Sequence, residues 1–349
     1  MTSQPDSGME QTENAIEMRA VEGKSQGKIV RERFLRHRGA IIGLAVLLFI
    51  AVLALTSIGF PVFGWYLGGW WKWNAVETMS VVNPGGAPTL TMPWSDEGFA
   101  IGDHPFGQDT IGRDIFARTM RGVQTSLVVM VVVGGVATLV GVLVGALSGF
   151  FRGFTDTFLM RITDLFITMP LLVIGAVLGK LVGSADPLPL ALALGFISWT
   201  TLARLVRGDF LSLREREFVD AARVAGASNS RIIFKHILPN AMGVIIVTVT
   251  LLMSAAILLE TALSYLGFGI SSPNVSLGTM ISEYQSAFGT RPWLFWWPGL
   301  FIIAIALCIN FIGDGLRDAF DPRQKQLPSA RKMARATRRE HQSSPAATH

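Results

Sequence analysis

Residues 126–150 read SLVVMVVVGGVATLVGVLVGALSGF, and this stretch decides the class of the fold. It contains no charged residue and is apolar around the whole circumference of a helix. An α-helix rises about 1.5 Å per residue, so about 20 apolar residues cross the roughly 30 Å hydrocarbon core of a bilayer. The stretch therefore predicts a transmembrane helix. Its glycines at 141, 145 and 149 share one face and predict that another helix backbone packs closely against it.

The same kind of apolar run occurs five more times along the chain. Hydrophobic residues make up 50% of the 349 residues and charged residues only 16%, whereas a soluble domain carries about a quarter charged residues. We therefore predict an all-α polytopic membrane protein with six transmembrane helices. The predicted spans are Ile41–Ile58, Ser126–Phe150, Met160–Val182, Leu188–Val206, Ala241–Ala262 and Leu294–Ile312.

Basic residues are distributed unevenly between the predicted loops, and this distribution predicts the orientation. Short loops rich in Lys and Arg stay in the cytoplasm. Arginines precede the first span, lie in the links after the second and fourth spans, and follow the sixth span. Both termini are therefore expected in the cytoplasm. Their basic residues suit anionic lipid headgroups, a reading that we favour over nucleic-acid binding.

Composition divides the chain into five parts. Residues 1–27 are polar and are expected to form a disordered cytoplasmic tail. Residues 28–58 hold a basic segment and the first span. Residues 59–125 form an extracytoplasmic segment, and their Gly and Pro content predicts loops with short helices. Residues 126–320 carry the other five spans, and residues 321–349 form a basic cytoplasmic tail.

No motif in the sequence predicts catalysis or cofactor binding. Residues 175–181, GAVLGKL, have three residues between the glycines and Leu181 after the lysine, so they do not match a P-loop. The chain has no Gly-x-Ser-x-Gly elbow and no His-Glu-x-x-His motif, and its five histidines are not at metal-ligand spacing. We therefore expect no enzyme activity, cofactor or metal site, and ATP hydrolysis by another chain.

Four charged residues lie within or beside the predicted spans, namely Asp164, Lys180, Arg204 and Glu260. A charge at the bilayer centre costs about 2.5–3.5 kcal/mol. Asp164 and Arg204 are expected within about one turn of the cytoplasmic end, so that no charged residue sits at the middle of a span. Glu260 lies near the outer end of the fifth span, where it is either a buried polar contact or an interfacial carboxylate.

The link between the fourth and fifth spans, at about 207–238, predicts two short helices outside the membrane. Alanines favour a helix over Phe218–Gly226, which the glycine ends, and a serine can cap a second helix over Arg231–Leu238. Pro239 suits the first turn of the fifth span. Small side chains at Ala221 and Ala222 suit docking into a groove on a partner, although an ordinary interfacial hairpin has the same composition.

The residues Asp220, Ala221 and Ala222, with Gly226 and then Pro239-Asn240, resemble the EAA motif of bacterial ABC importer permeases. The usual first residue of that motif is Glu, and Asp220 keeps its charge on a shorter side chain. The resemblance implies that this segment forms the coupling helices, which sit in a cleft of the cytosolic ATPase.

Further segments narrow the resemblance to permeases for oligopeptides, dipeptides and nickel. Gly107-Gln-Asp109-Thr-Ile-Gly112-Arg113-Asp114 is similar to that family's Gly-Thr-Asp-x-x-Gly-Arg-Asp signature, with Gln108 in place of Thr. Gly313-Asp314-Gly315-Leu316-Arg317-Asp318 resembles the family's C-terminal ending. Glu260 with residues 263–267 also matches a family pattern and is our candidate for a polar contact at an outer gate. The basic segment before the first span is most similar to the C-type subunit.

The resemblance implies a type I ABC importer permease in a bacterial cell membrane, and the sequence does not reveal its substrate. The implied partners are a second permease, two cytosolic ATPase subunits and an extracytoplasmic solute-binding protein. Closure of the ATPases on ATP would move the coupling helices and re-open the spans to the other side. The alternative is a stand-alone secondary transporter or channel. That class tends to have broken spans and charged residues near the midplane; here the third span has Pro170, but no charged residue is expected at the middle of any span.

Overall fold

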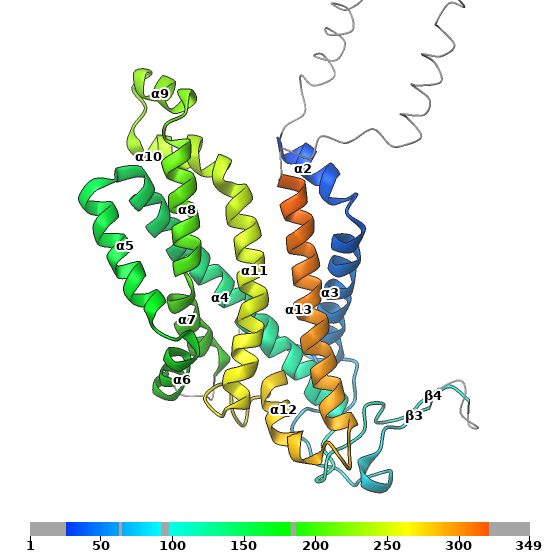
Figure 1. The fold of residues 1–349 in the computed structure, drawn as a ribbon. Helices are drawn as coiled ribbons and strands as arrows, with labels where there is room; N and C mark the ends of the chain where they lie inside the picture. The colour runs from blue at the N-terminus through cyan, green and yellow to red at the C-terminus, as the bar shows by residue number, and fades with distance from the viewer. Residues whose placement is uncertain (1–25, 63–64, 92–97, 183–185, 321–349) are drawn as a thin grey trace, which may run out of the picture.

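The computed structural model describes residues 26–62, 65–91, 98–182 and 186–320. Apart from residues 26 and 27, the two predicted tails lie outside these ranges. Figure 1 shows long helices packed side by side, with small helices at one end and short strands at the other. The predicted all-α membrane class is therefore confirmed.

The described residues contain four helices that are each long and apolar enough to cross a membrane. They are α3 (Arg38–Ser57), α4 (Ile115–Phe151), the continuous helix Asn229–Tyr265 that ends in α11 (Leu238–Tyr265), and α13 (Trp293–Phe320). Two bent pairs also qualify, α5 (Gly153–Thr168) with α6 (Leu171–Val182) and α7 (Pro187–Ser198) with α8 (Thr200–Leu213). Counting each bent pair as one span gives the predicted six.

The third and fourth spans differ from prediction because each bends. The axes of α5 and α6 differ by 86°, so Met160–Val182 is not one straight helix. Pro170 has no backbone N–H and disfavours helical geometry at the residue before it, and Met169 has φ −85° and ψ 132°. The axes of α7 and α8 differ by 42° at Trp199, where no proline or glycine marks the break.

The segment before α4 contains short strands where loops with short helices were expected. β1 (Phe60–Val62) pairs antiparallel with β2 (Trp65–Leu67), and β3 (Leu90–Thr91) pairs with β4 (Ala100–Ile101). A single 3₁₀ turn, η1, covers Pro84–Gly86. α4 starts at Ile115, before the predicted Ser126, so the last part of the segment 59–125 is helical.

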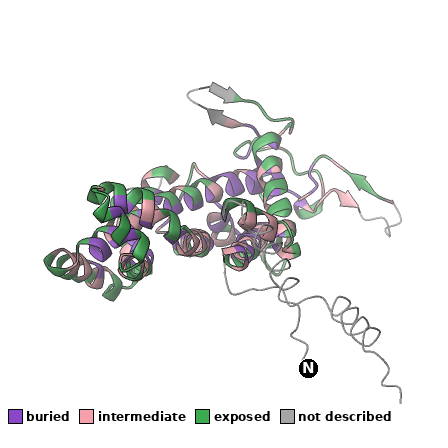
Figure 2. Ribbon diagram, turned by 90° about the horizontal axis from the view of Figure 1, so that it is seen from above, coloured by how far each residue is buried: buried purple, intermediate pink, exposed green. Residues whose placement is uncertain are grey.

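α4 is the central helix of the fold and contacts α3, α7, α8 and α11. Its glycine stripe faces α8, as the spacing predicted: a Cβ on Gly145 would lie 2.5 Å from the carbonyl oxygen of Ala203, and one on Gly149 would lie 2.6 Å from Cβ of Phe210. Figure 2 shows buried residues where helices meet and exposed residues on the outer faces. α3 packs mainly on α13, which in turn packs on α11.

The two ends of the bundle carry different elements (Figure 1). One end carries α2 (Gln26–Phe34), α9 (Glu217–Val224), α10 (Asn229–Arg231) and the last turns of α13. The opposite end carries the strands, α12 (Leu277–Tyr284) and the 3₁₀ turn η3 (Gln285–Ala287). We call the end with α9 and α10 the hairpin end, and the end with the strands the ribbon end.

Candidate functional site

The link between α8 and α11 folds into a helical hairpin, which we call the coupling hairpin. Its first arm is α9, which ends as the sequence predicted. Gly226 has φ +78°, a left-handed conformation that favours glycine. Its N–H donates to the Arg223 carbonyl (2.9 Å), and the N–H of Ala227 donates to the Ala222 carbonyl (3.0 Å). This pair of bonds satisfies carbonyls that the end of a helix would otherwise leave free. The chain therefore reverses direction sharply after α9.

The second arm runs without a break into the membrane-spanning helix. Ser228 caps α10, and its Oγ accepts the amide of Arg231 at 3.4 Å. A π-helical turn, η2 (Ile232–Ile237), then leads directly into α11. Pro239 lies in the first turn of α11, as predicted. Asn240 donates from Nδ2 to the His236 carbonyl (2.7 Å), which adds a side-chain donor in a turn where proline supplies no backbone N–H.

The inner face of α9 packs against this chain's own core. Val219 is fully buried and Ala222 is 9% exposed, and both belong to a cluster with Ile232, Ile237 and Phe210. The expectation that Ala222 docks into a partner is therefore wrong, because residues three apart on a helix share a face and Ala222 shares the buried face of Val219. The spacing of Val219 and Ala222, three residues apart, was the sequence signal that both lie on one buried face of the helix.

The outer face of α9 is open to solvent. Asp220 and Ala221 are exposed, and the apolar side chain of Val224 is 91% exposed. Asp220 pairs with Arg223 at 3.0 Å, an exposed ion pair of the kind that contributes little to stability. The coupling segment thus presents a small, partly apolar surface that its inner face holds in place.

Ion pairs beneath the hairpin join α8 to α4 and α5. Arg207 of α8 binds Asp156 of α5, which also accepts a hydrogen bond from Ser148 of α4. Arg152 pairs with Glu215 at 2.5 Å. Sequence reasoning counted Arg152 and Arg207 only as cytoplasmic charges, because a single sequence does not reveal which distant carboxylate each one meets.

Asp164 of α5 and Arg204 of α8 also pair with each other, with Nη2–Oδ1 at 2.5 Å. At about 1.5 Å per residue, Asp164 is about 16 Å along α5 from Gly153, and Arg204 is about 13 Å along α8 from Leu213. Both helices extend beyond the predicted spans at this end, so the expected position of the two charges near the cytoplasmic ends of the spans stays a prediction.

The segment Gly107–Asp114 forms a polar node at the ribbon end. Asp109 Oδ1 accepts the amides of Ile111 (3.0 Å) and Arg113 (2.8 Å). Its Oδ2 accepts Arg113 Nε (2.6 Å) and the hydroxyl of Tyr284 in α12 (3.0 Å). Glu283 binds both Arg113 and Arg118 of α4. Burial raises the pKa of Tyr284 well above its usual range, so this hydroxyl remains a donor.

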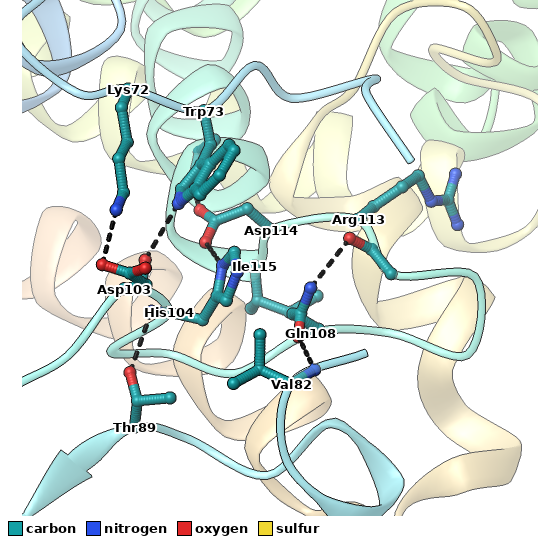
Figure 3. A network of polar contacts seen from close by, with 12 residues as sticks. Lys72, Trp73, Val82, Thr89, Asp103, His104, Gln108, Arg113, Asp114 and Ile115 are labelled. Carbon is teal, nitrogen blue, oxygen red and sulfur yellow. Dashed lines mark hydrogen bonds and ion pairs between the residues drawn. The ribbon is translucent and has the colours of Figure 1, made fainter. Parts of the chain in front are cut away.

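The carboxylate of Asp114 connects the outer segment to α4, and Figure 3 shows its contact with His104. Its Oδ1 accepts the amide of Ala117 (2.7 Å), which caps α4, and also the indole N–H of Trp71 (3.2 Å). Its Oδ2 lies 2.7 Å from Nδ1 of His104, and both side chains are buried. Burial raises the pKa of Asp114, and the hydrogen bonds from His104, Ala117 and Trp71 oppose this rise.

Gln108, which replaces the usual threonine of the signature, fastens the outer segment to this node. It is 1% exposed. Its Nε2 donates to the carbonyls of Ser80 (3.1 Å) and Gly112 (3.2 Å), and its Oε1 accepts the amide of Val82 (2.9 Å). One threonine hydroxyl cannot make all three bonds. The stretch before Gly107, to which the sequence assigned no role, is thereby held on the start of α4.

Glu260 is a buried polar contact and not an interfacial carboxylate. Its exposed fraction is 0%. Its Oε1 accepts the hydroxyl of Ser264, one turn later on α11 (2.7 Å), and its Oε2 accepts the hydroxyl of Ser126 on α4 (3.2 Å). The carboxylate therefore links α11 to α4 near the ribbon end.

The segment Gly313–Asp318 forms a packing surface for α3 at the hairpin end. A Cβ on Gly315 would overlap Cβ of Ala40, and one on Gly313 would lie 3.2 Å from Cγ2 of Thr250 in α11. Asp318 Oδ2 lies 3.5 Å from Nε2 of His37, the residue that caps α3. Asp314 and Arg317 are exposed.

The motifs found in the sequence are not gathered in one pocket. The hairpin and the Gly313–Asp318 segment lie at one end, and the Gly107–Asp114 node and Glu260 lie toward the other. Six candidate spans, two of them bent, with an exposed helical hairpin at one end and a polar node at the other, agree with the ABC importer permease that the motifs resemble.

Comparison with known families agrees with this class. The chain belongs to the family of binding-protein-dependent transport system inner membrane components, whose model matches residues 141–326. The model of the N-terminal TM domain of oligopeptide transport permease C matches residues 25–66.

Curated relatives match nearly the whole chain. The oligopeptide transport system permease protein OppC of Mycobacterium tuberculosis H37Rv is 37% identical over 306 residues, covering 87% of this chain and 97% of the relative. OppC of Escherichia coli K12 is 36% identical over 316 residues, covering 90% and 97%. Among solved structures, an inward-facing MetNI methionine ABC transporter aligns with a TM-score of 0.49 and 19% identity, covering 58% of this chain and 96% of that chain.

The chain is therefore a permease subunit of an ATP-driven, binding-protein-dependent importer of the bacterial inner membrane. It is a transport component and not itself an enzyme, and it works with an ATPase and other components of the importer. Family membership decides against the stand-alone transporter or channel.

Proposed function

We propose that this permease belongs to an importer of oligopeptides or dipeptides. The support is the match to relatives named as oligopeptide permeases, which cover about nine-tenths of the chain. In this proposal the chain pairs with a second, different permease, and substrate passes between the two. Two cytosolic ATPase subunits and an extracytoplasmic binding protein complete the importer.

The observation that carries the coupling part of the proposal is the exposed outer face of α9. Asp220, Ala221 and the 91% exposed Val224 form a protruding surface, while Val219 and Ala222 anchor it to the core. The protruding helix presents small side chains on a face that its own core holds in place, which suits a groove on a protein partner. We assign this face to the cleft of a cytosolic ATPase, and Gly226, Pro239 and Asn240 to the turns that hold it.

This assignment places the hairpin end in the cytoplasm and the ribbon end outside. Both α2 and the end of α13 lie at the hairpin end (Figure 1), so the two tails join the bundle on the ATPase side. The polar node around Asp109 and Asp114 then faces the binding protein. The basic residues of the link between α8 and α11 agree with this orientation.

Reconstitution of the complete importer in proteoliposomes tests the proposal. We expect the peptide-loaded binding protein to stimulate ATP hydrolysis and to drive uptake of labelled tri-alanine. Vesicles with the same ATPases and binding protein but without this chain should show neither. Uptake of nickel or of free amino acids without peptide uptake would contradict the peptide assignment, while leaving the permease class intact.

A further inference from the structure

The ion pair between Asp164 and Arg204 has no role in the fold or in the coupling hairpin described above. The side chains are 47% and 49% exposed, respectively, so the pair lies at the surface of this chain. Each residue belongs to a bent span, Asp164 to α5 and Arg204 to α8. The pair therefore joins the two elements of the bundle that are least straight.

The position of the pair within two spans limits what it can face. Both residues lie inside the predicted spans Met160–Val182 and Leu188–Val206, about 13–16 Å along α5 and α8 from the helix ends at the hairpin end. Leu165, beside Asp164, is 62% exposed and suits lipid, whereas a half-exposed ion pair within a span does not. Charged groups inside a membrane commonly face a bundle interior or a water-filled path. The surface around Asp164 and Arg204 is thus expected to face water or the partner permease.

A cavity of about 490 Å³ opens where the two spans bend. Its wall includes Ile167 and Met169 at the end of α5, Thr200 and Thr201 at the start of α8, and Thr248 and Leu252 of α11. Residues three apart on a helix share a face. Asp164 therefore shares the face of Ile167, and Arg204 shares the face of Thr201, so the pair flanks the cavity on its hairpin side.

The wall of the cavity can contact many kinds of side chain, whereas the ion pair can recognise charged groups. Apolar groups and hydroxyls line the cavity, and no charged residue is among its lining residues in the described chain. Such a wall accepts side chains of many kinds. The neighbouring charges toward the hairpin end are Arg161, the Arg207–Asp156 pair and Asp209. One carboxylate and one guanidinium at the edge of such a cavity match a zwitterion.

We propose that this cavity is the chain's share of the peptide path, and that Asp164 and Arg204 bind the charged ends of a peptide in transit. The carboxylate of Asp164 accepts hydrogen bonds from the α-ammonium group, and the guanidinium of Arg204 donates two parallel hydrogen bonds to the α-carboxylate. Without substrate the two side chains satisfy each other, so the net charge of the path is the same in both states. The proposal rests on the proposed function of peptide import.

Accessibility of the pair is the first test. In a Cys308→Ala background, Asp164→Cys and the control Leu165→Cys are placed in the assembled importer in proteoliposomes. We expect a charged, membrane-impermeant methanethiosulfonate to modify position 164 and not position 165. Equal labelling of both positions would overturn the proposal.

Peptides with blocked ends provide the second test. Uptake of tri-alanine and of N-acetyl-tri-alanine amide is measured at equal occupancy of the binding protein, with occupancy determined by calorimetry. We expect the complete importer to prefer the free peptide by about tenfold or more, because the blocked peptide lacks both charges that the pair would bind. The double variant D164N/R204Q should lose this preference. R152Q/E215Q, which neutralises an ion pair of equal length at the hairpin, should keep it.

A purely structural pair gives a different result. If the pair only latches α5 to α8, D164N/R204Q slows uptake of both peptides by the same factor and leaves their ratio unchanged, which overturns the proposal. If the unmodified importer takes up neither peptide, the proposed peptide function fails instead. The two failures are therefore distinguishable.

Discussion

The guanidinium of Arg207 binds the carboxylate of Asp156 through two hydrogen bonds, Nε–Oδ1 at 2.5 Å and Nη2–Oδ2 at 2.7 Å. This bidentate pair joins α8, which leads to the coupling hairpin, to α5 of the bent third span. Lysine cannot reproduce two parallel bonds. We expect Arg207→Lys to lower the peptide taken up per ATP hydrolysed in proteoliposomes, and Arg207→Ala to destabilise the complex further by about 1–3 kcal/mol. An unchanged ratio and an unchanged melting temperature in both variants would show that the pair is dispensable.

The two faces of α9 predict opposite results for a matched pair of substitutions. Ala221→Trp adds volume on the exposed face, so the permease should keep its melting temperature and lose the ATPase subunits during purification. Ala222→Trp adds the same volume inside the cluster with Val219 and Ile232, where overpacking costs about 1–3 kcal/mol. It should lower the melting temperature of the permease itself. Retention of the ATPases and of full transport by Ala221→Trp would show that α9 is not the coupling helix.

Gly226 should tolerate side chains poorly for a conformational reason alone. No atom lies within 4 Å of a Cβ added at this residue, but its φ is +78°. Left-handed geometry costs an L-residue about 1–2 kcal/mol, and a β-branched residue tolerates it least. We expect Gly226→Val to reduce peptide-stimulated ATP hydrolysis strongly and Gly226→Asn to reduce it only slightly. Gly208→Val, at an equally open glycine in α8 without a positive φ, is the control and should change little.

A polar and an apolar replacement of Glu260 should differ in their effects on peptide uptake and on the stability of the complex. Glu260→Gln can still accept hydrogen bonds from Ser126 and Ser264, so peptide uptake should fall only slightly. Glu260→Leu leaves both buried hydroxyls without this acceptor, at a cost of about 1–3 kcal/mol each. The uptake rate and the melting temperature of the purified complex should both fall in the leucine variant. Equal values for the two variants would mean that the carboxylate contributes neither to stability nor to an outer gate.

Cysteine labelling tests the orientation of the chain. In a Cys308→Ala background, we expect cysteines at Ser212 and Ser329 to react only from the cytoplasm and one at Ser95 only from outside. The reason is that α9 and the end of α13 share the hairpin end, and that the hairpin is rich in arginine (Figure 1). Labelling of positions 95 and 212 from the same side would contradict the six-span arrangement.

Local patterns in the sequence account for the spans and for the hairpin turns. Each apolar run is helical, the third and fourth as bent pairs of helices, because burial of the backbone in lipid requires internal hydrogen bonds. Gly226 and Pro239 took the positions that their φ preferences predict. The start of α4 was missed because Arg118 and Arg121 precede the apolar run, although Asp114 is an ordinary N-cap residue with its acceptor aimed at Ala117.

Contacts between distant residues could not be predicted from one sequence. Asp164 and Arg204 are 40 residues apart in the chain, and Arg118 is 165 residues from Glu283. No local pattern specifies such pairs, because they depend on how the spans pack. The same reason applies to Gln108, which departs from the family signature and makes three hydrogen bonds to the outer segment and to Gly112.

α4 has a mechanical consequence for the whole subunit. It is a continuous helix of 37 residues, about 55 Å long, and its first turn is fixed by Asp114 to the outer segment. Its last turns lie against Phe210 and Arg207 of α8, directly below the coupling hairpin. The neighbouring spans contain bends of 86° and 42°. The subunit therefore combines one long continuous helix, α4, with two bent spans. We expect a displacement of the outer segment to tilt α4 as a whole, while the angles of the two bends change to accommodate it.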